Sequence, residues 1–226
     1  MNRNENYIGK LEDTLAKFMK PVRDIPFVIA IKVLSGFAVL SFDKSSGEDI
    51  ELLELLKKVA STAGERAYKA AIFTNRPNEA GNRIEPFVKE ALNEIGLKAD
   101  TPLAADGKRK AVGYPDIEIQ DSHGRTVYLE CKTYNIDNID TTQRAFYFSP
   151  SENFKVTKDA LHLMVSFQIE KESRGGRTAF VPVHWRLYTL EDLTVDIKLE
   201  FNQNNRKMYG SESLPQSLLA EGSIVI

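Results

Sequence analysis

The sequence has a single cysteine, nearly balanced charges and no long hydrophobic run. Each of these features excludes a class of protein. Cys131 is the single cysteine among 226 residues, which excludes an internal disulfide framework and a multi-cysteine zinc site and fits a reducing compartment. The longest apolar runs, 27–33 and 37–42, have the length of strands and are too short to span a bilayer. The N-terminus is polar and lacks the apolar stretch of a signal peptide. We therefore expect a cytoplasmic protein without a membrane segment.

Composition and charge further restrict the classes of protein that fit this sequence. Glycine and proline are not enriched, at 13 and 9 residues, so no long disordered region is indicated. The formal net charge of −2 argues against a protein that coats DNA nonspecifically, because such proteins usually carry a basic excess. It is compatible with an enzyme whose acidic site binds a metal and whose basic side chains gather on one face. The length suits one domain, residues 1–226.

Hydrophobic periodicity predicts an α/β architecture. Apolar side chains recur at helical spacing in three segments, 6–20, 49–60 and 82–96. Strands are predicted as a hairpin formed by 27–33 and 37–42, as a second hairpin formed by 112–120 and 126–134, and as β-rich stretches at 145–149, 161–169 and 179–189. This order predicts a central mixed β-sheet flanked by helices.

The second predicted hairpin carries ionisable side chains on one face. Because side chains alternate along a strand, Glu130 and Lys132 point the same way, and the turn can bring Asp116 of the preceding strand close to them. The opposite face is apolar and includes Val127, Leu129 and Cys131, so Cys131 is expected in the core. Three ionisable groups on an otherwise buried sheet are costly without a partner. A divalent cation can be that partner.

These residue types suit phosphodiester hydrolysis. Carboxylate oxygens are ligands that Mg²⁺ prefers, and Mg²⁺ keeps several waters and bridges to phosphates. A bound metal lowers the pKa of a water and neutralises developing charge. Lys132 can orient or deprotonate the attacking water and contact the phosphate. The alternative is an exposed hairpin whose polar face is simply solvated.

Two other acid-x-Lys triplets, 106–108 and 196–198, occur in the chain, but neither follows a Pro-Asp at a suitable distance. Pro115-Asp116, thirteen intervening residues and Glu130-Cys131-Lys132 resemble the signature of the PD-(D/E)xK nuclease superfamily, and among its members the type II restriction endonucleases. The resemblance implies a restriction-endonuclease-like fold with its catalytic core at about 82–170, between an N-terminal helical and hairpin region and a C-terminal β-rich extension. It also implies that Asp116 and Glu130 bind the metal and that Lys132 is the catalytic lysine.

Many members of the superfamily add a glutamate from the helix before the first motif strand, and Glu85 matches that place. The alternative for Glu85 is structural, because Asn82 and Glu85 stand three residues apart at a predicted helix start, as in a capping box.

Two polar segments are candidates for contacts with DNA. Lys108, Arg109 and Lys110 precede the first motif strand and can hold backbone phosphates, although a charged surface loop is an equally ordinary interpretation. The segment after the motif is rich in groups that can contact base edges; its candidates are Tyr134, Asn135, Asn138, Thr142, Gln143 and Arg144.

The leading hypothesis is a Mg²⁺-dependent type II site-specific deoxyribonuclease. Such an enzyme is expected to be a homodimer, because two active sites related by a two-fold axis match the two strands of a palindromic site in double-stranded DNA. A structure-specific or repair nuclease with the same metal site, such as a junction resolvase, is one alternative. A noncatalytic DNA-binding protein on the same fold is the other.

Overall fold

The computed structural model describes residues 3–20, 22–74, 77–140, 146–198 and 219–220. The chain separates into two compact units, one formed by Met1–Arg23 with Asp196–Ile226 and the other by Asp24–Val195. The first unit contains α1 (Arg3–Phe18). Strands β1 (Val22–Pro26) and β8 (Thr194–Ile197) pair as a separate two-stranded sheet.

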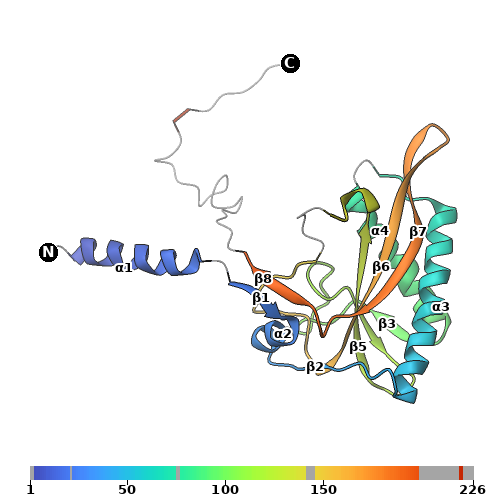
Figure 1. The fold of residues 1–226 in the computed structure, drawn as a ribbon, viewed down its shortest axis with the longest axis horizontal. Helices are drawn as coiled ribbons and strands as arrows, with labels where there is room; N and C mark the ends of the chain where they lie inside the picture. The colour runs from blue at the N-terminus through green and yellow to red at the C-terminus, as the bar shows by residue number, and fades with distance from the viewer. Residues whose placement is uncertain (1–2, 21, 75–76, 141–145, 199–218, 221–226) are drawn as a thin grey trace. The chain divides into compact units, whose positions relative to one another are not determined.

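The second unit is built on a six-stranded sheet in the order β2-β6-β5-β4-β3, with β7 on β6 (Figure 1). Its strands are β2 (Val39–Leu40), β3 (Lys98–Asp100), β4 (Ile117–Gln120), β5 (Thr126–Tyr134), β6 (Ala160–Arg174) and β7 (Arg177–Thr189). β6 pairs in parallel with β2 and β5, whereas the pairs β3–β4, β4–β5 and β6–β7 are antiparallel. The predicted mixed sheet is confirmed.

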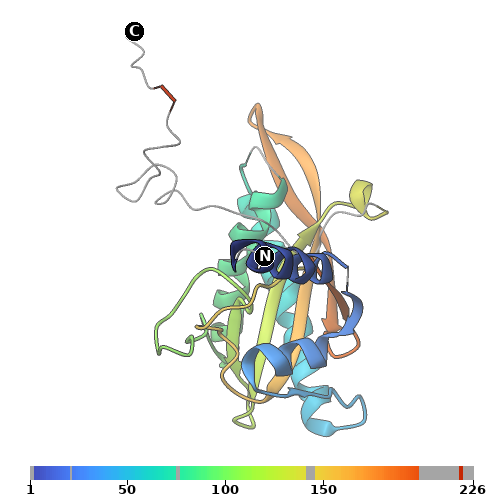
Figure 2. The same ribbon diagram turned by 90° about the vertical axis from the view of Figure 1, so that its left-hand side faces the viewer.

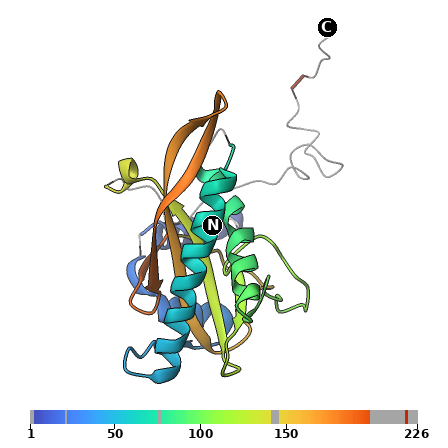
Figure 3. The same cartoon turned by 90° about the vertical axis from the view of Figure 1, so that its right-hand side faces the viewer.

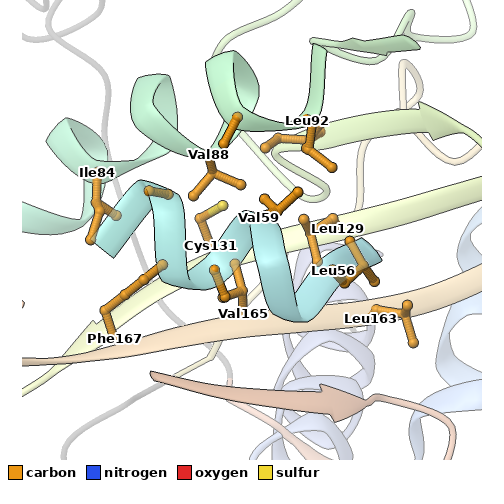
Figure 4. Close-up of a cluster of buried hydrophobic side chains, with 14 of the residues drawn as sticks. Leu56, Val59, Ile84, Val88, Leu92, Leu129, Cys131, Leu163, Val165 and Phe167 are labelled. Atoms are coloured by element: carbon orange, nitrogen blue, oxygen red, sulfur yellow. The ribbon is translucent and has the colours of Figure 1, made fainter. Parts of the chain in front are cut away.

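Helices cover both faces of this sheet. α3 (Gly47–Ala70) and α4 (Pro77–Glu94) lie on one face (Figure 3), and α2 (Phe27–Ser35) lies on the other (Figure 2). α3 forms because its apolar residues recur every three or four positions and bury one stripe against the sheet. The main core between α3, α4 and the sheet includes Leu56, Val59, Ile84, Val88, Leu92, Leu129, Cys131, Leu163, Val165 and Phe167 (Figure 4). Among the described residues, no helix is long and apolar enough to cross a membrane.

The predicted hairpin at 27–33 and 37–42 is wrong. Residues Phe27–Ser35 form α2, with Pro26 before its first turn and Gly36 after its last, at φ 81°. The Gly36 N–H donates to the Lys32 carbonyl, and this glycine ends the helix. The β-branched residues before Gly36 made the segment resemble a strand, so the helix end was not predicted from the sequence. Tertiary packing overrides β propensity here, because Phe27 and Ile31 are fully buried one turn apart on the same face.

Other predicted elements exist with different ends. The helix expected at 49–60 continues to Ala70, and that at 82–96 begins at Pro77. The strand expected at 112–120 begins only at Ile117, which leaves Asp116 in the preceding loop. Residues 146–149 form no strand.

Candidate active site

Asp116 is fixed to the strand that carries the other two motif residues. Its Oδ2 accepts a hydrogen bond from the Cys131 N–H at 2.9 Å. The β4–β5 register pairs Ile117 with Leu129, so one further step places Asp116 opposite Glu130. Burial raises the pKa of Asp116 above its ordinary value, against the opposing effects of the Cys131 N–H and the Lys132 ammonium.

Glu130 is almost completely buried in the middle of β5, with 2% of its surface exposed. Its Oε1 accepts a short hydrogen bond from Lys132 Nζ, and its Oε2 is buried with no hydrogen-bond partner among the described residues. Burial, reinforced by the nearby charge of Asp116, raises the pKa of Glu130 to about 7. A buried carboxylate oxygen without a partner is costly, so this atom is positioned for a ligand.

Lys132 stays protonated in this arrangement. Burial acts to lower its pKa, but Glu130 and then Asp116 outweigh that effect and the pKa lies above the ordinary lysine value. Its Nζ also lies 5.9 Å from the ring centroids of both Phe146 and Tyr147. A firmly protonated ammonium favours contact with phosphate over removal of a proton from water.

An aromatic cluster covers the strand face that carries Glu130. Side chains alternate between the two faces of β5 as predicted, but Tyr128, two residues before Glu130, is fully buried and not solvated. It belongs to a second core cluster that includes Phe27, Ile31, Tyr114, Phe154, Val156, Ala160 and Leu190. The apolar cover explains why the carboxylates are desolvated, and it makes the solvated-hairpin alternative wrong.

His162 belongs to the same cover. Its Nδ1 lies 2.6 Å from the Tyr114 hydroxyl, and burial lowers the pKa of its imidazole to about 3. The ring is therefore neutral, and it packs against Phe27 and Tyr128. A structural role accounts for these contacts.

Glu85 lies on α4 and is paired within its own helix. Lys89 Nζ is 2.5 Å from Glu85 Oε1, yet the charge of Glu85 still raises the pKa of Asp116. α4 approaches β5 closely at Gly81, where a Cβ would lie 3.4 Å from Thr133 Oγ1. The capping-box interpretation is wrong, because α4 begins at Pro77, more than a turn before Asn82.

The donor set fits a hard divalent cation. Asp116 and Glu130 supply desolvated carboxylates, and the unpartnered Oε2 of Glu130 gives a free oxygen ligand. Within the described ranges no group of three or more acidic, histidine or cysteine side chains is arranged around one metal position. Mg²⁺ suits such a site because it keeps waters in several of its positions. When bound, it would supply positive charge to the phosphate and acidify a water.

The basic loop before β4 is only partly available for DNA. Arg109 pairs with Asp100 at 2.9 Å and also donates to the Thr101 carbonyl, so it braces its own loop. Lys110 Nζ lies 4.0 Å from Asp106, and Lys108 is exposed. The structure does not bring these side chains into contact with Asp116 or Glu130.

The polar segment after β5 is described only in part. Tyr134 stacks under the Arg186 guanidinium at 5.4 Å. The Asn135 side chain accepts from the Asp137 N–H and caps a short 3-10 helix, η1 (Ile136–Asn138). The side chain of Asn138 lies outside the described residues, as do Thr142, Gln143 and Arg144.

One charged residue near the site escaped the sequence analysis. Lys155 follows the motif by more than twenty residues, is only 2% exposed, and influences the pKa values of both Asp116 and Glu130. Its one sequence signal is weak: it stands between Phe154 and Val156, two core residues.

Comparisons with known proteins agree on one family. A family model described as the type II restriction enzyme MjaV family matches residues 21–212. The type II restriction enzyme MjaV of Methanocaldococcus jannaschii is 37% identical over 222 residues, which are 91% of this chain and 94% of that enzyme. No solved structure matches the chain significantly.

A mixed sheet with Glu130 and Lys132 on β5 and Asp116 just before β4 is consistent with the PD-(D/E)xK nucleases, and the matches make the protein an endodeoxyribonuclease of the type II restriction class. The chain belongs to the type II restriction enzyme MjaV family. The family and class predicted from the sequence are thereby confirmed.

Proposed function

We propose that this protein hydrolyses phosphodiester bonds of double-stranded DNA at a short recognition sequence, with Mg²⁺ bound by Asp116 and Glu130. The observation that carries the proposal is the buried Glu130 carboxylate, which has one oxygen on Lys132 and the other without a partner. Membership of a restriction enzyme family supports the same conclusion.

The side chains divide the chemistry between them. Asp116 and Glu130 hold the cation, and the Cys131 N–H keeps the Asp116 carboxylate turned toward β5. Lys132, protonated and held by Glu130, places its positive charge where the phosphate gains negative charge. The aromatic cover lowers the local dielectric constant and so strengthens each of these interactions. Glu85 is proposed as an outer acidic residue that acts on Asp116 through its charge.

Digestion of a long DNA of known sequence tests this function. Purified protein with Mg²⁺ is expected to give discrete fragments whose sequenced ends share one short symmetric motif. Replacement of Mg²⁺ by a chelator is expected to stop the reaction, because the site then lacks its positive charge. A smear without common ends, or fragments formed equally well in the chelator, would contradict the proposal.

Contacts with DNA are proposed for the two polar segments that flank the motif. Lys108 and Lys110 offer ammonium groups to backbone phosphates, while Arg109 supports their loop through Asp100. Tyr134 and Asn135 lie at the end of β5 and just beyond it, in the same chain segment as Lys132. The same segment continues in the sequence with Asn138, Thr142, Gln143 and Arg144.

We further propose that residues 1–226 act as one nuclease domain in the cytoplasm, where the single free cysteine, Cys131, stays reduced.

The proposed enzyme is a homodimer, and α1 is our candidate for its contact. Ile8, Leu11, Leu15 and Phe18 follow the 3-4-3 spacing of a two-stranded coiled coil. All four side chains are exposed, from 37% for Leu15 to 65% for Phe18. An isolated helix of 16 residues is marginal in water, so pairing with α1 of a second copy would stabilise it and bury the stripe.

The double variant Leu11→Glu with Leu15→Glu tests the dimer. We expect sedimentation equilibrium to give about twice the chain mass of 25.5 kDa for the parent and the single chain mass for the variant. Lys10→Glu with Lys17→Glu adds the same two carboxylates to α1 away from the stripe and is expected to leave the dimer intact. A monomeric parent would contradict the dimer, and a dimeric leucine variant would contradict the role of α1.

A further inference from the structure

Lys155 is a buried lysine whose ammonium is not neutralised by an ion pair. Its side chain is 2% exposed, and its Nζ donates to the Lys110 carbonyl at 3.3 Å, a long hydrogen bond to an uncharged acceptor. The ion pairs of the described residues do not include it. By contrast, Lys132 is paired with Glu130, and Lys158 pairs with Glu118 at 2.7 Å.

The ammonium of Lys155 lies in the electrostatic field of the active site. Its charge lowers the pKa of Asp116 and of Glu130, and these two carboxylates with Glu85 act in return to raise the pKa of Lys155. Burial is the larger effect and leaves the pKa of Lys155 below its ordinary value. The loop before β6 that carries Lys155 lies against the face of β5 that carries Glu130, because the Thr157 N–H donates to the Tyr128 hydroxyl at 3.0 Å and because Phe154 and Val156 pack in the same core cluster as Tyr128.

Burial of the unpaired Lys155 ammonium costs free energy unless an anion binds it. A buried lysine without a carboxylate partner loses hydration that a single carbonyl does not replace. A lysine ammonium has three donors, and a single hydrogen bond to the Lys110 carbonyl among the described residues leaves two of them for an oxyanion. The anion that a nuclease brings to Asp116 and Glu130 is the phosphate of its substrate.

We propose that Lys155 is a second cationic residue of the active site, which contacts a non-bridging oxygen of the phosphate that is cleaved. This inference rests on the proposed nuclease function. Lys132 and Lys155 then hold the phosphate from two different segments of the chain. The bond from Lys155 to Lys110 links this contact to the basic loop at 108–110.

Removal of the Lys155 charge has two opposite consequences. The phosphate loses a cation that stabilises its transition state, so cleavage slows. The carboxylates lose a neighbouring positive charge that repels a metal ion, so metal binding becomes tighter. A lysine with a purely structural role would not move these two quantities in opposite directions.

The experiment compares the parent, Lys155→Met, Lys155→Arg and Lys158→Met. Single-turnover cleavage at saturating Mg²⁺ is expected to fall about 100-fold in Lys155→Met and to be largely retained in Lys155→Arg. Calorimetric titration with Mn²⁺ in the absence of DNA is expected to show tighter binding to Lys155→Met than to the parent. Lys158→Met removes an exposed lysine three residues away and is expected to change neither quantity.

Two results would overturn the inference. One is a folded Lys155→Met protein that cleaves within twofold of the parent. The other is slower cleavage without tighter Mn²⁺ binding, which would indicate a structural role. Lys155→Gln replaces Lys155→Met in both assays if circular dichroism shows that the methionine variant does not fold. A parent that cuts no DNA would contradict the proposed function instead, and the titration, which needs no cleavage, would still decide whether Lys155 faces the cation site.

Discussion

Glu130→Gln is expected to abolish detectable cleavage and, in the same protein, to raise the stability of the metal-free fold above neutral pH. Loss of cleavage follows because a neutral amide replaces the carboxylate that pairs with Lys132 and that we propose as a ligand of the cation. The gain in stability follows because a buried carboxylate with one unpartnered oxygen is costly when it is ionised.

The sign of the pH dependence comes from the direction of the pKa shift. The pKa of Glu130 is about 7 in the folded protein, against an ordinary value of 4.5. Between these values the folded protein retains a proton that the unfolded chain has lost, so stability decreases as the pH rises through this window. A separation of about 2.5 pH units (7 minus 4.5) corresponds to roughly 3 kcal/mol. Glu130→Gln removes this penalty.

Thermal unfolding between pH 5 and pH 8 measures the effect. The parent is expected to lose stability toward pH 8 and to recover it when Mg²⁺ is added, because a ligand that binds only the folded state stabilises it. Glu130→Gln is expected to show a smaller dependence on pH and no response to Mg²⁺. Glu118→Gln, on the neighbouring strand and paired with Lys158, is the matched control and is expected to behave like the parent. Equal responses to Mg²⁺ in the parent and Glu130→Gln would remove Glu130 from the metal site.

Lys132→Ala is expected to slow single-turnover cleavage by about 1000-fold. The ammonium of Lys132 is protonated, half-buried beside the rings of Phe146 and Tyr147 and fixed by Glu130, so neither water nor a neighbouring side chain easily replaces it. Affinity for DNA in Ca²⁺, which accepts the same oxygen ligands, is expected to change by less than about tenfold, because one phosphate contact among several is lost.

The chain offers a matched control for this variant. Lys198 ends a second acid-x-Lys triplet, Asp196-Ile197-Lys198, and is exposed. Lys198→Ala is therefore expected to cleave at the rate of the parent. If Lys132→Ala cleaved DNA as fast as Lys198→Ala, the catalytic assignment of Lys132 would be wrong even if the protein were a nuclease.

The strand geometry of the site could be predicted because it depends on local periodicity. Alternation along 126–134 separates Cys131, which is buried in the main core as predicted, from Glu130 and Lys132. The turn between β4 and β5 is short, so the antiparallel register that places Asp116 near Glu130 also follows from the sequence.

The remainder depends on contacts between distant segments. The cover over Glu130 comes from α2 and from the loops around Tyr114 and Phe154, and no local pattern relates these segments to β5. For α2 the apolar run has strand propensity, and the helix is decided by burial of Phe27. Lys155 escaped prediction for the same reason, because its loop reaches the site through tertiary contacts that no local sequence pattern indicates.

A digest of one defined DNA by the parent and by Asp116→Asn, side by side in Mg²⁺, directly tests whether cleavage occurs at the proposed metal site. Asp116→Asn keeps the shape of the side chain and an oxygen that can accept a hydrogen bond from the Cys131 N–H, but it removes the charge that we propose to bind the cation. We expect discrete fragments with a common end sequence from the parent and intact DNA from Asp116→Asn. The same fragments from both proteins would show that the cleavage does not occur at the site formed by Asp116, Glu130 and Lys132.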